Sequence, residues 1–424
     1  MKLPSIEKKD RQLLSNTVML YIMQFSTYLF SFITVPYLTR VLGVQLYGKI
    51  GVAVANMAYF QLLMDFGFLL SATEDISAHR EDRAYVGKKL TSVALIKAAF
   101  AAVSFGVIFA LTCFAEPFKS YRTMYLLYIA AYIANSFLPD YFYRGVEKMT
   151  AITVRTVFVK LFSTVMTFVL LRSKSDYLIV PALLLASNLI AVVWAYFYLL
   201  KTLGFRFRRV TWADVRADLK RSSLFFLSRI AGTVYSATNT IITGYIDPTG
   251  PTAGYYTSAD KIVSTAKSGL SPISDSVYPY MIKNKNFSLI KKILLVAEPV
   301  IIAGCVVVGV FARPLCVLAF GSEYAETAPI LRAFLPVIAV ILPSYLLGFP
   351  TLGAMGLSRY ANHSIFIGTG VQLAGLALLW ATGQLTAVHL AMLTSLTETV
   401  IMATRAFFVY RNRGLWKQPE TAEE

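Results

Sequence analysis

Residues 17–41 read TVMLYIMQFSTYLFSFITVPYLTRV, an apolar stretch whose single charge, Arg40, lies at its end. A helix of about 20 such residues crosses the roughly 30 Å hydrocarbon core of a bilayer. Apolar runs of similar length recur as far as Tyr410. The strands of transmembrane barrels instead alternate in polarity over about ten residues. The sequence therefore predicts an all-α, polytopic integral membrane protein.

Composition supports this class. The chain is 56% hydrophobic and 15% charged, with a mean hydropathy of +0.60, whereas a soluble domain carries about 25% charged residues. Hydropathy predicts twelve transmembrane spans: 17–41, 50–73, 91–113, 122–143, 150–171, 177–200, 222–246, 254–281, 293–312, 328–351, 360–382 and 384–410.

The net charge of +17 has a topological interpretation. When the loops and span ends are assigned to alternating sides, most lysines and arginines fall on the side of the N-terminus. Short loops rich in Lys and Arg stay in the cytoplasm. Both termini are therefore expected in the cytoplasm, and nucleic acid is not expected as a partner.

The segment 201–221 divides the chain into two groups of six spans. It carries seven basic residues, and Thr211 and Asp214 have the spacing of a capping box. We expect an N-terminal lobe over 1–205 and a C-terminal lobe over 206–424. A shift of 209 residues places a polar stripe of the first span on one of the seventh, which favours parallel repeats with a binding site between them; chance alignment of Ser and Thr is the alternative. The stripes are Gln24, Thr27, Ser31, Thr34 and Thr233, Ser236, Thr240, Thr243.

Five basic residues stand out inside the expected spans: Lys97, Lys160, Arg229, Lys261 and Lys267. A charge at bilayer depth costs roughly 2.5–3.5 kcal/mol on insertion scales and usually faces a bundle interior or a wet cavity. Lys97 lies near the end of its span and could snorkel to the surface. The remaining four indicate a basic interior that suits an anionic cargo.

The eighth span has the strongest polar stripe. Arg229 continues the hydroxyl stripe of the seventh span, so two neighbouring helices present basic and hydroxyl groups together. Guanidinium and ammonium groups bind phosphate, and hydroxyls suit sugar oxygens. The alternative is internal ion pairing. The available acids are Asp260, which adjoins Lys261, and Asp65, Asp140, Glu298 and Glu398. The stripe consists of Asp260, Ser264, Lys267, Ser271 and Asp275, widened by Lys261 and Ser268.

The sequence offers little support for catalysis. It has no GxxxxGK[ST] phosphate loop, and its three histidines and three cysteines are scattered without metal-ligand spacing. We therefore expect no catalytic residues, no metal and no cofactor, and do not expect an enzyme.

Several short patterns occur in order along nearly the whole chain. They are PYLTRVLG at 36–43 with Tyr47-Gly48, DFGF at 65–68 with SAT at 71–73, DYFYRGVEKM at 140–149, GYY at 254–256, ADKI at 259–262, and Pro272 and Pro279. Together, and in the corresponding spans, they resemble the bacterial O-antigen and polysaccharide flippases of the MATE-like superfamily. Two departures stand out: Tyr141 and Tyr143 replace a tryptophan-containing pattern, and Asn239 stands where many relatives carry an acid, which puts ion coupling at that position in doubt.

The resemblance implies two six-helix lobes around a cationic cavity, alternating access, and a location in the bacterial inner membrane. It further implies a cargo of undecaprenyl-pyrophosphate-linked oligosaccharide, moved from the cytoplasmic to the periplasmic leaflet for O-antigen, capsule or exopolysaccharide synthesis. Membrane lipid and other polysaccharide-assembly membrane proteins would be its partners.

Our hypothesis assigns the pyrophosphate to Arg229, Lys261 and Lys267, with Lys160 contributing from the other lobe. Sugar hydroxyls would meet Gln24, Thr233, Ser236, Asn239 and Thr240, and Asp65 or Asp260 would orient nearby cations or serve coupling. Two alternatives stay open: a multidrug-type small-molecule antiporter of the same superfamily, and an integral membrane glycan-modifying enzyme.

Overall fold

The structure is a computed structural model that describes residues 8–414. Within that range the side chains of residues 8–15, 17, 224, 227, 228, 231, 235, 236 and 279 are outside the description. The described residues form helices and loops and contain no strand, so the all-α prediction is confirmed.

The chain divides into two compact units. Unit 1 comprises Ala53–Ile230 and the described part of Met1–Leu46, and unit 2 comprises Tyr47–Val52 and the described part of Ala231–Glu424. The division falls inside a helix, whereas the sequence predicts a lobe boundary at 205/206, in the loop before it. The helices are α1 (Lys8–Asp65), α2 (Phe68–Ala78), α3 (Arg83–Phe114), α4 (Arg122–Ser136), α5 (Asp140–Gly145), α6 (Met149–Leu170), α7 (Ile179–Phe197), α8 (Trp212–Ile246), α9 (Thr252–Asn284), α10 (Phe287–Val310), α11 (Ala312–Phe320), α12 (Thr327–Leu346), α13 (Ser358–Ala381) and α14 (Ala387–Arg411).

Eight helical segments of the described residues are long and apolar enough to cross a membrane. The predicted spans at 122–143, 222–246 and 254–281 fall on helices that lie outside this set, because α4 is short and α8 and α9 carry polar stripes. The predicted number of twelve spans therefore stays a prediction. The segments are Val18–Ala78, Arg83–Phe114, Met149–Leu170, Lys174–Thr202, Phe287–Val310, Thr327–Gly353, Ser358–Ala381 and Ala387–Arg411.

Helix α1 contains a break where the sequence predicts a loop between two spans. Gly43 has φ 72° and ψ 171°, outside the helical region. A positive φ of this size is accessible to glycine at little cost and strains other residues. Gly43 thus separates the helical segments that correspond to the predicted spans 17–41 and 50–73.

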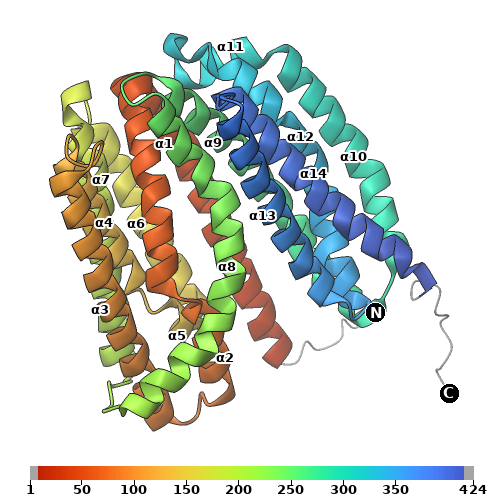
Figure 1. The fold of residues 1–424 in the computed structure, drawn as a ribbon. Helices are drawn as coiled ribbons and strands as arrows, with labels where there is room; N and C mark the ends of the chain where they lie inside the picture. Colours follow the sequence, from red (N-terminus) through yellow and green to blue (C-terminus); the bar gives the residue numbers. More distant parts are fainter. Residues whose placement is uncertain (1–7, 415–424) are drawn as a thin grey trace. The chain divides into compact units, whose positions relative to one another are not determined.

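Unit 1 is a helical bundle in which α7 packs against both α4 and α6, and α3 packs against α4. Figure 1 shows these helices side by side, coloured orange to yellow. Short helices α2 and α5 pack together at one end of the unit, where a buried aromatic and aliphatic core includes Phe68, Tyr141, Phe142 and Tyr143.

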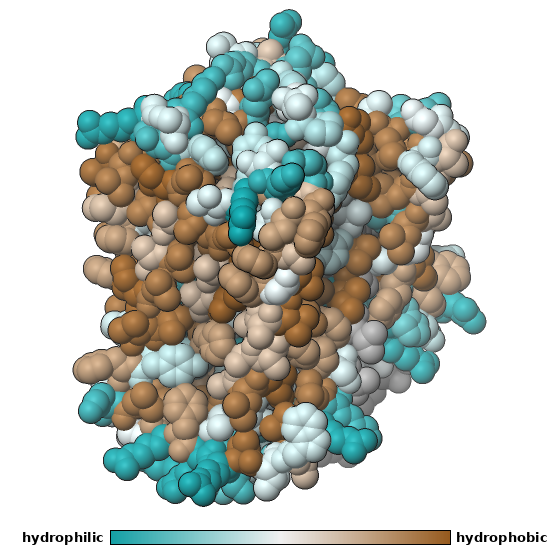
Figure 2. Space-filling view, turned by 60° about the vertical axis from the view of Figure 1, so that its left-hand side comes forward, coloured by the Kyte–Doolittle hydropathy of each residue, from teal (hydrophilic) through white to brown (hydrophobic). Residues whose placement is uncertain are grey.

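Unit 2 is a second bundle. Helix α12 contacts α9, α10 and α14, and α13 packs against α14. Figure 1 shows α13 and α14 side by side in blue. On the face seen in Figure 2, hydrophobic residues form a band between two hydrophilic edges. A band of this kind is the surface that a helix bundle presents to lipid.

The segment before α8 is fixed to unit 1. Thr211 and Asp214 form the predicted capping box: the Thr211 N–H and hydroxyl each lie 2.9 Å from Asp214 Oδ2, and the Asp214 N–H donates to Thr211 Oγ1 at 3.3 Å. The hydrogen bond from the Thr211 backbone holds the pKa of Asp214 below its usual value. Upstream, the Arg208 N–H donates to Thr91 Oγ1 at 3.0 Å. The chain therefore enters α8 at a defined place on α3.

A buried ion cluster joins the start of α8 to α2 and α3. Lys89 Nζ donates to Asp75 at 2.8 Å and also to Asp218. Arg221 pairs with Asp75 and lies 3.1 Å from Glu74. Because Lys89 balances two largely buried carboxylates, removing its charge would leave Asp75 with Arg221 alone and would take from Asp218 the cation that it pairs with here.

We expect Lys89→Met to destabilise the protein markedly, since removing one partner of a buried ion pair costs about 3–5 kcal/mol. The measurement is the apparent unfolding temperature of the detergent-purified protein. Lys88→Met is the matched control, because Lys88 is exposed on the same helix. Equal unfolding temperatures for the two variants would contradict a stabilising role of this cluster.

Candidate functional site

Unit 1 contains a cavity that polar and apolar side chains of its helices line together. Its volume is about 400 Å³ and Lys160 of α6 lines it. Hydroxyls, amides and one acid share the lining with apolar side chains, which is the composition of a site for a polar ligand. Its polar lining residues are Thr27, Tyr132, Asn135, Asp140, Arg155, Thr156, Lys160 and Asn188.

One wall of the cavity is fixed by an ion pair. Arg155 Nη1 and Nη2 donate to the two carboxylate oxygens of Asp140 at 2.8 and 3.2 Å. This two-bond geometry is the strongest form of such a pair. Asp140 is available because the chain turns at Pro139 and begins α5 at Asp140. Lys160 lies five residues beyond Arg155 and lines the same cavity, which therefore holds two cations and one acid.

Lys97 does not snorkel to the surface, so that part of the sequence interpretation is wrong. It is only 5% exposed, donates to the backbone carbonyl of Ser136, and lies 3.5 Å from Asp65 Oδ1. Ser136 is the last residue of α4, so its carbonyl lacks the regular helical donor. The freed carbonyl and the acid hold Lys97 inside unit 1.

The other unit 1 candidates are more open. Asp65 accepts a hydrogen bond from Gln61 Nε2 at 2.9 Å in addition to its contact with Lys97. Gln24 Nε2 donates to the Tyr28 hydroxyl. Arg229, near the end of the α8 segment that belongs to unit 1, is exposed.

In unit 2, Lys267 of α9 pairs with Glu398 of α14, with Nζ and Oε1 at 2.5 Å. The Glu398 side chain is 3% exposed and that of Lys267 is 24% exposed. Pairing with an acid was the alternative to cargo binding, and Lys267 adopts it in this structure. The difference in exposure leaves Lys267 accessible from one side, while Glu398 is enclosed.

A second buried cation in unit 2 supports an interrupted helix. Arg405 Nη1 donates to the Ser344 carbonyl at 2.8 Å, and its Nε donates to Ser364 Oγ at 2.9 Å. The helix is interrupted just after Ser344: a π-helical segment begins at Leu347, and Gly348 within it has ψ −121°. The Ser344 carbonyl accepts from the Leu347 N–H as well as from Arg405. Arg405 thus adds a side-chain donor where α12 gives way to the interruption.

Asn239 is committed to an internal amide network. It is 1% exposed; its Nδ2 donates to Thr394 Oγ1 at 2.8 Å, and its Oδ1 accepts from Gln372 Nε2 at 2.9 Å. Thr397 in turn donates to Gln372 Oε1 at 2.9 Å. Contact between Asn239 and a sugar would require these bonds to be exchanged.

The remaining unit 2 candidates lie on α8 and α9. Thr240 is buried, while Thr233, Asp260 and Lys261 are half-buried. Ser236 lies among the side chains outside the description. The structure brings Lys160 into a cavity and Lys267 against an acid.

Sequence reasoning missed three interior residues. It did not propose Arg155, Arg405 or Gln372 as residues of the site. Each lies within a predicted span, and the pairing of Arg155 with Asp140 across adjacent spans was the available signal. Among residues 8–414, no group of three His, Cys, Asp or Glu side chains is arranged to hold a metal ion.

Sequence comparison identifies relatives along most of the chain. The family model described as "Polysaccharide biosynthesis protein" matches residues 13–285. A candidate O-antigen transporter of Shigella dysenteriae is 27% identical over 84% of this chain and 90% of its own length. One from Escherichia coli K12 is 25% identical over 67% of this chain and 68% of its own length.

Solved structures share the fold. The lipid II flippase MurJ in an inward closed conformation superposes with a TM-score of 0.68 at 13% identity, covering 94% of this chain and 87% of MurJ. An inward-facing multidrug MATE transporter of the MOP superfamily gives 0.66 at 12% identity, covering 96% of this chain and 100% of that one. Because the family model matches residues 13–285, more than half of the chain, the chain belongs to the polysaccharide biosynthesis protein family.

Proposed function

We propose that this protein is a flippase that moves undecaprenyl-pyrophosphate-linked oligosaccharide units from the cytoplasmic to the periplasmic leaflet of the bacterial inner membrane. The relatives named as O-antigen transporters support the class of cargo. The likeness to a lipid II flippase supports the kind of movement. No catalytic step is part of the proposal.

The observation that carries the proposal is the unit 1 cavity of about 400 Å³ with Lys160 in its lining. A cargo that combines pyrophosphate with sugars needs cations, hydrogen-bonding amides and hydroxyls together. The cavity offers Lys160, Asn135, Asn188 and Thr27 in one enclosure. In unit 2, Lys267 is the corresponding cation, with one accessible side.

In the proposal, Lys160, Arg229, Lys261 and Lys267 serve the pyrophosphate. Sugar hydroxyls are bound by Gln24, Thr233, Ser236 and Thr240. Asn239 is retained only for a state in which its internal bonds have opened. Asp65 and Asp260 orient neighbouring cations or serve coupling. The polypeptide forms two six-span lobes with both termini in the cytoplasm and works beside other membrane proteins of polysaccharide assembly.

The rival within the fold class is a small-molecule antiporter. The two functions are distinguished by expressing this protein in a strain from which its gene has been deleted. Restored surface polysaccharide supports the flippase. Export of a cationic dye without restored polysaccharide supports the antiporter. Transfer of glycosyl or acyl groups by the purified protein would instead support a membrane enzyme.

The topology predicts which loops face outwards. In a background with all three cysteines replaced by alanine, Lys119→Cys and Gln384→Cys should react with a membrane-impermeant maleimide in intact cells. Arg209→Cys should react only after permeabilisation. The reverse labelling pattern would refute cytoplasmic termini, and identical labelling of positions 119 and 209 would refute the number of spans between them.

Lys160→Gln should reduce surface glycan at equal membrane abundance, because it removes a cation from the unit 1 cavity, while Lys160→Arg should retain most activity. A lost charge-assisted hydrogen bond is worth about 1.5–3 kcal/mol, or roughly tenfold or more in affinity. Lys119→Gln, which alters an exposed loop lysine, is the control. Normal glycan with Lys160→Gln would remove this residue from the site.

The pairing of Lys267 with Glu398 permits a test that separates cargo binding from charge neutralisation. Lys267→Gln should reduce surface glycan. If Lys267 binds cargo, the double variant Lys267→Gln, Glu398→Gln stays defective although no buried charge is left unpaired. Recovery of glycan in the double variant would show that Lys267 only neutralises Glu398. Membrane abundance and unfolding temperature, measured for both variants and the unaltered protein, exclude misfolding as the cause.

A further inference from the structure

A second cavity lies in unit 2, between α10 and α12, and its lining differs in chemistry from that of the unit 1 cavity. Its volume is about 480 Å³, within the range of roughly 300–1,000 Å³ for small-molecule sites. Helix α10 beside it exposes large apolar side chains, among them Val296, Val300 and Val306, which marks this side of the helix as lipid-facing. The lining residues are Ile290, Lys291, Leu294, Leu295, Glu298, Pro299, Ile302, Pro343 and Leu347.

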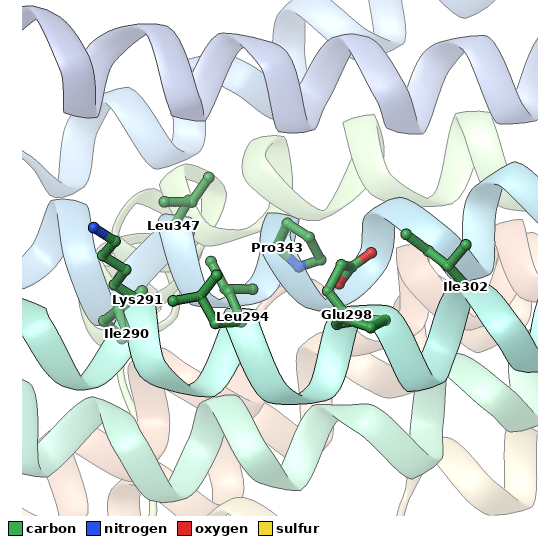
Figure 3. A pocket seen from close by; sticks show the side chains of 9 residues that line it. Ile290, Lys291, Leu294, Glu298, Ile302, Pro343 and Leu347 are labelled. Atoms are coloured by element: carbon green, nitrogen blue, oxygen red, sulfur yellow. The ribbon is translucent and has the colours of Figure 1, made fainter.

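One acid in this groove has a buried carboxylate oxygen without a hydrogen-bond partner. Glu298 Oε2 is inaccessible to solvent and has no hydrogen-bond partner among the described residues. Figure 3 shows its carboxylate turned toward Pro343 of the facing helix, while Lys291 points away from it toward the far end of the groove. Glu298 is the twelfth residue of a 24-residue helix, far from either end. A carboxylate in that position calls for a partner.

The surrounding backbone supplies no donor to Glu298. Pro299 and Pro343 both line the groove, and proline has no N–H. In a helix each proline also removes the usual donor from the carbonyl four residues before it, here Leu295 and Ala339. Around Glu298 the groove therefore gathers hydrogen-bond acceptors and hydrocarbon. A complementary ligand must bring its own donor and an apolar body.

We propose that this groove binds a lipophilic ammonium, meaning a protonated amine on an apolar chain, with the ammonium at Glu298 and the chain against Leu294, Ile302 and Leu347. The site lies within unit 2 and is separate from the residues assigned to the lipid-linked cargo. An anionic lipid fits less well. Its phosphate would stay near Lys291, two turns away, and only hydrocarbon would reach the carboxylate.

The test uses three probes with the same chain: dodecylamine, dodecanol and dodecyl phosphate. Each is added to the full-length protein in detergent, and bound probe is counted by native mass spectrometry. We expect dodecylamine to bind best, and Glu298→Gln to lower its binding about tenfold, the factor that a charge-assisted hydrogen bond represents. Lys291→Gln should leave amine binding unchanged.

A chemical readout locates the amine. A hydrophobic carbodiimide adds to a carboxyl group and activates it. A neighbouring amine then attacks the activated carboxyl carbon and forms an amide, and the carbodiimide leaves as a urea. The protein gains the mass of dodecylamine less one water. Peptide mapping should find this adduct on Glu298, with the exposed Asp275 as the reference acid. Equal binding of dodecanol, preference for dodecyl phosphate that depends on Lys291, or an adduct distributed equally over Glu298 and Asp275 would each overturn the proposal.

Discussion

Helices that carry charges through hydrocarbon must give each charge a partner, and the interior of this protein depends on that requirement. An unpartnered ion at bilayer depth is costly. Arg155 is joined to Asp140 by two bonds, and Lys267 to Glu398 by one. Because each partner comes from a different helix, the same bonds that neutralise the charges also fix the helices relative to each other within a unit.

Helix interruptions provide the second kind of partner. The end of α4 leaves the Ser136 carbonyl to Lys97, and beside the π-helical segment Leu347–Gly353 the Ser344 carbonyl accepts a further hydrogen bond from Arg405. In membrane proteins, irregular backbone is tolerated where protein surrounds it or where it lines a cavity. Each cation thus makes an otherwise costly interruption possible, and each interruption helps to hold a cation inside. Broken helices of this kind border the binding sites of many transporters.

Hydropathy predicted the helices well because hydrocarbon imposes one requirement on every lipid-facing residue. The predicted span 91–113 lies within α3, and 150–171 differs from α6 by one residue at each end. Charge partners were harder to predict. They depend on which helices pack together and on where α4 and α12 are interrupted, and a single sequence specifies neither. Lys97 illustrates this: its position near a span end suggested snorkelling, but the carbonyl that receives it lies on a different helix.

Because charge partners depend on helix packing, the sequence predicted the composition of the candidate site more accurately than the contacts of its residues. The basic character of the interior follows from the sequence, and Lys160 and Lys267 are both within the bundles. Asn239 looked like a polar residue available to cargo, yet Gln372, on a helix 133 positions later in the chain, uses its amide oxygen. Most of the interior acids named above have a cation, whereas Glu298 has none among the described residues and faces a groove lined by prolines and hydrocarbon. Internal pairing therefore distinguishes structural charges from those that a ligand can still reach. A charged group that is enclosed with its partner stabilises the bundle. A charged group that is exposed on one side, or an acid without a cation, can still bind a ligand.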